Sequence, residues 1–201
     1  MGAKQRGDIK EICDLVAPEM GIITSVGEMH LETFGSVENV ARTKFELIDA
    51  LPEGGVGVVN IDSEAAYRHL KSNNIKALTY GIENTEAEYR ATNIAYSATE
   101  TTFALSHGGR VDEGYATHIL GRGNILNITA ALAIAEHLGA QDPLACILLF
   151  PGCNRGLRRI LPGLLNHIGR IRKGTGLLLF RFLCLLNLFT VIFLIFHLLS
   201  L

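Results

Sequence analysis

A loop, a lysine and a glycine-rich turn carry the residues of this 201-residue chain that could do chemistry. Glu28, His30 and Glu32 form an E-x-H-x-E pattern directly after an apolar run at 20–26. Ligands of α/β proteins bind beyond the carboxyl ends of the strands, and carboxylates with one imidazole suit a hard divalent cation. The competing interpretation is a solvated loop, which is the commoner case for a single histidine. Both interpretations stay open on these residues alone.

Lys44 lies on the wrong side of its predicted helix for a charged residue. On a helical wheel for residues 36–51, it falls about 20° from Val37, in the middle of the apolar stripe. An amine placed there loses hydration, so its pKa should fall, and a neutral lysine is a nucleophile. It can also be carbamylated by CO2 and so become an anionic metal ligand. The alternative, which the wheel alone favours, is a lysine whose stem covers apolar surface.

The glycine-rich turn Gly121-Arg122-Gly123-Asn124 precedes a very apolar helix predicted over 124–138. Asn124 is a good helix N-cap, and its amide could instead pair with the edge of adenine by donating and accepting at once. The glycines do not match the G-x-G-x-x-G fingerprint, so a dinucleotide site is only weakly indicated.

The elements that must position these residues alternate between helix and strand. Apolar periodicity and turn residues predict helices at 8–16, 36–51, 63–72 and 124–138, parallel strands at 20–26, 56–60 and 76–80, and antiparallel strands at 89–97, 101–106 and 111–120. The predicted fold class is therefore α/β, with a mostly parallel sheet flanked by helices and a small antiparallel sheet. A hydrophobic helical tail is expected at the C-terminus.

Charge divides the chain into two compositions. All 20 Asp and Glu residues precede residue 143, whereas 7 of the 18 Lys and Arg residues follow it. A uniformly basic nucleic-acid binder is excluded, because the acidic part would repel phosphates. The four cysteines form no C-x-x-C pair, and the polar stretch 1–10 carries no signal peptide, so a cytoplasmic location is expected.

The C-terminal stretch 176–201 is apolar enough to cross a bilayer as a helix. A basic linker at 143–175 precedes it, and the positive-inside rule would keep that linker in the cytoplasm, which gives a tail anchor. The alternative is that the residues after about 143 come from an out-of-frame reading of the gene. Both origins remain open.

Four stretches carry a resemblance to a known family. They are 1–9 (MGA followed by GDI), 21–52 (GIITSVGEMHLETFGSVENVARTKFELIDALP), 59–62 (VNID) and 120–135 (LGRGNILNITAALAIA). Residues 1–142 resemble the central, ATP-binding domain of the Mur ligases, and most of all the MurF type.

The resemblance implies an ATP-dependent ligase of peptidoglycan precursor synthesis. In that family ATP phosphorylates a substrate carboxylate, and an amino group then attacks the acyl phosphate to form an amide. The implied partners are a UDP-MurNAc-peptide and D-Ala-D-Ala, and the implied cofactors are ATP and Mg2+. His30 matches a magnesium ligand, Lys44 the carbamylated lysine that helps to hold a second magnesium, and Asn124 the asparagine that contacts adenine.

The chain also departs from the family pattern. The phosphate-binding motif G-x-x-G-K-[ST] occurs nowhere in it, and neither the metal-binding glutamate nor the C-terminal domain of the family has a counterpart. Ser25 stands where Asn is usual, and Gly123 where His is usual. We expect a fragment that lacks turnover by itself and binds Mg·ATP more weakly than micromolar, since little would hold the triphosphate.

Two further functions stay open. One is a non-catalytic binding protein anchored in the membrane through 176–201. The other is a ligase of the related MurE or folylpolyglutamate synthase type.

Overall fold

The computed structural model describes residues 2–28 and 31–139. All the helices and strands described below lie between residues 8 and 137. His30 and the predicted segments 143–175 and 176–201 lie outside the described residues. Within the described ranges, no helix has the length and apolar character needed to span a membrane.

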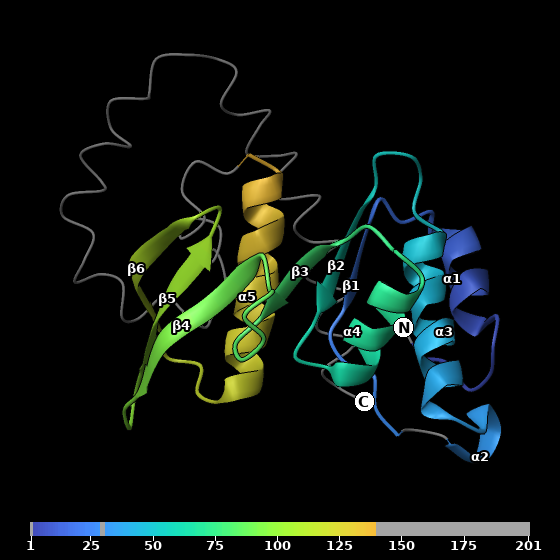
Figure 1. Ribbon diagram of the computed structural model, residues 1–201, viewed down its shortest axis with the longest axis horizontal. Coiled ribbons are helices and arrows are strands. Elements are labelled where there is room, and N and C mark those ends of the chain that lie inside the picture. Colours follow the sequence, from blue (N-terminus) through green and yellow to red (C-terminus); the bar gives the residue numbers. More distant parts are fainter. Residues whose placement is uncertain (1, 29–30, 140–201) are drawn as a thin grey trace. The chain divides into compact units, whose positions relative to one another are not determined.

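The predicted α/β class is confirmed, because helices and strands alternate along the first half of the chain (Figure 1). In order the elements are α1 (Asp8–Val16), β1 (Met20–Ile23), α2 (Leu31–Phe34), α3 (Val37–Asp49), β2 (Val56–Asn60), α4 (Glu64–Ser72), β3 (Leu78–Gly81), β4 (Tyr89–Tyr96), β5 (Thr101–His107), β6 (Arg110–Thr117) and α5 (Arg122–His137). The short helix α2 includes Glu32, which the sequence predicts to lie in a loop.

The six strands form one sheet in the order β1-β2-β3-β4-β5-β6. The strands β1 to β4 are parallel to their neighbours, and β4, β5 and β6 are antiparallel. The sequence predicts a separate small antiparallel sheet, but the structure joins the two parts. The joint is short, with Tyr80 opposite Tyr89 and Gly81 opposite Arg90. The carboxyl ends of β1, β2 and β3 therefore meet at one edge.

Helices α3 and α4 cover one face of the parallel strands, and α1 packs on α3 (Figure 1). The core beneath them combines apolar side chains of both helices with those of β1 and β2: Ile23, Val40, Ala41, Phe45, Ile48, Val59, Ile61, Ala66 and Leu70. The Ser36 hydroxyl caps α3 by accepting from the Asn39 amide. The Glu46 carboxylate of α3 accepts from the amides of Gly7 and Lys10 and so fixes the start of α1.

Helix α5 is buried on two sides, as its apolar sequence predicts. Ile125 and Leu132 pack with Phe103 and Leu105 of the antiparallel strands. On its other side, Ala130, Ala133 and Ile134 pack with Val58 and Tyr80 of the parallel strands. The helix thus joins the two halves of the sheet.

The start of α5 differs from the prediction. The helix begins at Arg122 with Gly121 as its N-cap residue, so the expectation that Asn124 is the N-cap is wrong. The physical reason is the backbone of Gly121, whose φ of 102° turns the chain into the helix earlier than expected. Asn124 instead donates its side-chain amide to the carbonyl oxygen of Leu120 at 2.7 Å.

The double role of α5 predicts a large effect of a truncation on its buried side. Leu132 is 0% exposed, and Leu132→Ala should lower the free energy of unfolding by about 2–5 kcal/mol, because it leaves a cavity beside the antiparallel strands. Leu138→Ala is the matched control, since Leu138 is 49% exposed and its loss should change stability by less than about 0.5 kcal/mol. Urea unfolding of both variants checks this. Equal effects would contradict the packing described for α5.

Candidate functional site at the carboxyl edge of the sheet

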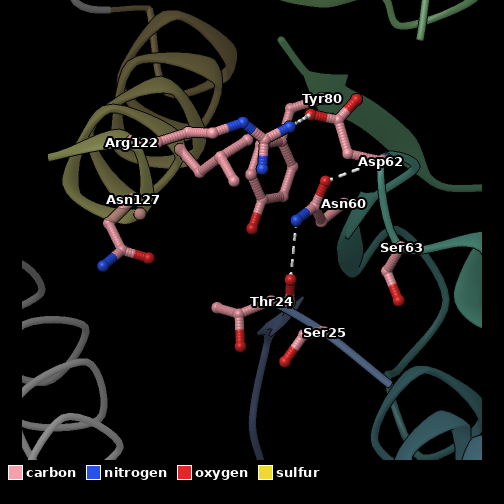
Figure 2. Close-up of a pocket in the computed structure, with 10 residues that line it drawn as sticks. Thr24, Ser25, Asn60, Asp62, Ser63, Tyr80, Arg122 and Asn127 are labelled. Carbon is pink, nitrogen blue, oxygen red and sulfur yellow. Dashed lines mark hydrogen bonds and ion pairs between the residues drawn. The ribbon is translucent and has the colours of Figure 1, made fainter. Parts of the chain in front are cut away.

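An open hollow of about 430 Å3 lies where the carboxyl ends of β1, β2 and β3 meet the first turns of α5 (Figure 2). Parallel strands place their carboxyl ends on the same edge, and ligands of α/β sheets bind there. The lining residues come from all four elements and the loops that follow them: Thr24, Ser25, Asn60, Asp62, Ser63, Tyr80, Arg122, Gly123, Leu126 and Asn127.

The Asp62 carboxylate organises this edge. Its side chain is 5% exposed and accepts hydrogen bonds from three successive backbone amides after β3: Ile82 at 2.9 Å, Glu83 at 3.0 Å and Asn84 at 2.9 Å. The guanidinium of Arg122 in α5 adds an ion pair at 3.0 Å. One buried carboxylate therefore joins the end of β2, the loop after β3 and the start of α5.

A glycine makes room for this carboxylate. A Cβ atom on Gly81 would lie 2.6 Å from the Asp62 Oδ1 atom, which is closer than any real contact. The side chain of Asp62 can approach the backbone of the next strand only because position 81 carries no side chain.

Asn60 makes the corresponding connection between β1 and β2. Its side chain donates to the Thr24 carbonyl oxygen at 2.7 Å and accepts from the Asp62 amide at 3.0 Å (Figure 2). Asn60 is 5% exposed, and a buried side-chain amide without hydrogen-bond partners would lower the stability of the fold.

Lys44 reaches this edge from α3. Its Nζ atom donates to the carbonyl oxygen of Ser25, a residue of the hollow, at 2.8 Å. Burial lowers the pKa of the Lys44 amine below its ordinary value, as the helical wheel predicts. The amine is thus held beside a carbonyl oxygen at the rim of the hollow.

The other predicted site residues are not all brought to this place. His30 lies outside the described residues, and Glu28 and Glu32 are exposed. Among the residues the structure describes, no group of three His, Cys, Asp or Glu side chains could hold a metal ion. The predicted cation site at Glu28, His30 and Glu32 is therefore untested.

Asn124 does not line the hollow, whereas Asn127 does, one turn further along α5. The sequence analysis also missed Asp62, Tyr80 and Arg122 as site residues. Asp62 and Tyr80 could have been found from their places at the ends of the predicted strands 56–60 and 76–80. No sequence signal pairs Arg122 with Asp62, which is 60 positions away.

The chemistry of the lining suits an acceptor-rich ligand. Thr24, Ser25, Tyr80 and Asn127 line the hollow and carry hydroxyl or amide groups. These groups can all donate hydrogen bonds, and phosphates or other oxygen-rich groups accept them. The fold and site together define an α/β domain with a polar hollow at the carboxyl edge of its sheet.

The family profile described as the Mur ligase middle domain matches residues 1–135. The chain belongs to the Mur ligase family.

Relatives with two different substrates match the chain. The UDP-N-acetylmuramoyl-L-alanyl-D-glutamate–2,6-diaminopimelate ligase of Chlamydia muridarum is 35% identical over 61% of this chain and 25% of its own length. The UDP-N-acetylmuramoyl-tripeptide–D-alanyl-D-alanine ligase of Bacillus subtilis is 31% identical over 69% of this chain and 29% of its own length. The chain thus spans less than a third of the length of these two relatives.

A solved structure supports the fold. MurF ligase from Thermotoga maritima, determined in complex with ADP, matches with a TM-score of 0.60 and 24% identity over 72% of this chain and 33% of that one. The predicted resemblance of the chain to the Mur ligase central domain is therefore confirmed. The comparisons do not separate the MurF type from the ligases that add diaminopimelate.

The contacts of Asp62 predict a specific loss of stability. Asp62→Asn should lower the free energy of unfolding by about 1.5–3 kcal/mol, because an amide oxygen replaces a charged acceptor and the new NH2 group meets donors. Urea unfolding measures this change. Glu83→Gln is the control, since Glu83 also pairs with Arg122, at 3.2 Å, but is 72% exposed and should contribute less than about 0.5 kcal/mol. A mild effect of Asp62→Asn, equal to that of the control, would contradict the role of Asp62.

Proposed function

We propose that this chain supplies part of the ATP and magnesium site of a cytoplasmic Mur-type ligase, which extends a UDP-MurNAc-peptide during peptidoglycan precursor synthesis. The family membership supports the reaction class. The observation that carries the proposal for this chain is the position of Lys44, a half-buried amine bonded to the rim of a hollow at the carboxyl edge of the sheet.

Lys44 can become a metal ligand through its neutral form. The unprotonated amine adds CO2, forms a carbamate and releases one proton, so a cation becomes an anion at the rim. Burial favours this step, because desolvation lowers the pKa of the amine and raises its neutral fraction. The carbamate oxygens of Lys44 and the imidazole of His30 would hold Mg2+, which supplies charge neutralisation for phosphoryl transfer.

Asn124 is the proposed contact to adenine. Its bond to the Leu120 carbonyl uses one of the two N–H groups of the side-chain amide. Recognition of the adenine edge needs one N–H and the amide oxygen. The hydrogen bond to Leu120 would therefore orient the amide while the other N–H contacts the base.

For the substrates we propose the MurF type, with D-Ala-D-Ala as the added group, on the resemblance of the stretch 21–52. The alternative is addition of diaminopimelate, which the relative from Chlamydia muridarum favours at 35% identity. Both reactions join an amino group to a carboxylate of a UDP-MurNAc-peptide, so the proposed roles of Lys44 and His30 are the same in each.

Carbamylation of Lys44 tests the proposal on the 201-residue chain. With 13C-labelled bicarbonate, NMR should show one protein carbamate signal that grows as the pH rises through the lowered pKa of Lys44 and disappears in Lys44→Arg. Lys71 provides the matched control, because its hydrogen bond to Glu86 raises its pKa and keeps it protonated over the same range. Lys71→Arg should leave the signal unchanged. A chain without a carbamate, or a signal that survives Lys44→Arg, would overturn the proposed metal site.

A further inference from the structure

The hydroxyl of Tyr80 is buried without a hydrogen-bond partner in the part of the chain that the structure describes. Tyr80 is 0% exposed, and its hydroxyl makes no hydrogen bond to any residue that the structure describes. Figure 2 shows the phenol ring beside Asn60 with its hydroxyl directed into the hollow that Thr24 and Asn127 also line. The one unpaired end of this buried side chain thus faces the candidate ligand site.

The neighbouring polar groups are already bonded to one another. Arg122 pairs with Asp62 and Glu83, and Asn60 bonds both Thr24 and Asp62. These bonds hold the walls of the hollow in place. Tyr80 differs from them, because its ring fills a gap in the core against α5 while its hydroxyl is left unused.

An unpaired buried hydroxyl lowers the stability of the folded chain. A phenylalanine would pack the same ring volume without that cost, since it has no polar group to desolvate. A tyrosine at this position therefore makes the chain less stable when the hollow is empty. Its hydroxyl becomes favourable only when a molecule with a hydrogen-bond acceptor enters the hollow.

The hydroxyl keeps its proton under ordinary conditions. Burial, with a smaller contribution from the negative charge of Asp62, raises the pKa of Tyr80 far above its usual value. The group in the hollow is thus a neutral donor, suited to an oxygen or a ring nitrogen that carries a lone pair.

We propose that the Tyr80 hydroxyl is a positioning group for the nucleotide: it donates a hydrogen bond to an acceptor atom of the nucleotide and so orients that molecule in the hollow. This inference rests on the proposed nucleotide site and adds a residue to it. If the hydroxyl oxygen is removed, the chain without ligand should therefore become more stable, whereas its affinity for nucleotide should fall.

Tyr80→Phe tests this opposition on the full chain. Urea unfolding without ligand should show a variant at least as stable as the native chain. Titration with Mg·ATP at millimolar concentrations, followed by saturation-transfer NMR, should show affinity about tenfold weaker, because one buried hydrogen bond to the ligand is lost. A purely structural tyrosine would not separate the two readouts in this way.

Tyr67→Phe is the matched control. The Tyr67 hydroxyl donates to Glu86 at 2.6 Å on the other side of the sheet, so its loss removes an existing bond and should not change the affinity for Mg·ATP. Separate titrations with adenosine and with tripolyphosphate then assign the acceptor to the nucleoside or to the phosphates, and a loss in either supports the inference.

Three results would overturn it. A Tyr80→Phe variant that is less stable without ligand would show that the hydroxyl has a structural partner. Unchanged affinity for Mg·ATP would remove the role of Tyr80 while the nucleotide site stands. No detectable binding of Mg·ATP by the native chain would remove the nucleotide site itself, and the role of Tyr80 with it.

Discussion

The carboxylate of Asp62 holds together three segments that are far apart in the sequence, and the candidate site depends on that connection. Charged acceptors form the stronger hydrogen bonds, and this one bonds three backbone amides and a guanidinium while almost fully shielded from water. Because the amides follow β3 and the guanidinium belongs to α5, the position of the helix relative to the strand ends is fixed at this point. The hollow lies between the segments that Asp62 joins.

Burial has opposite consequences for the polar groups around that hollow. Asp62 and Asn60 are buried with their bonds satisfied, so they shape the edge. Burial of Lys44 favours the neutral form of its amine, and the buried hydroxyl of Tyr80 bonds to none of the described residues. Asp62 and Asn60 give the site its geometry. In the proposals above, the Lys44 amine can react with CO2 and the Tyr80 hydroxyl can donate to a ligand.

Much of the fold could be predicted from the sequence, because local signals determine it. The run VGVVN is a strand over the predicted residues 56–60, and the Ser36 cap and the buried helix α5 follow from capping and apolar content. The joining of the two parts of the sheet could not be predicted, because it depends on two residue pairs between β3 and β4. The start of α5 could not be predicted either, because it depends on the backbone angle of Gly121. Asn124 was therefore wrongly expected to be the N-cap.

Of the three predicted site residues, the structure places only Lys44 at the rim of the hollow. Lys44 stands out because a charge interrupts the apolar stripe of its own helix, and the structure brings it to the rim of the hollow. Asp62 and Arg122 could not be paired from the sequence, since their contact depends on the packing of α5 across the strand ends. The roles of His30, Lys44 and Asn124 in binding metal and adenine remain predictions.

Amide hydrogen exchange of the native chain tests the central role of Asp62 most directly. The amides of Ile82, Glu83 and Asn84 lie in a loop, yet each donates to the Asp62 carboxylate, so they should exchange as slowly as the amides of the neighbouring strand β3. Exchange of all three at the rate of an exposed loop would show that the carboxylate does not hold the edge of the sheet, and the account of the site would fail with it.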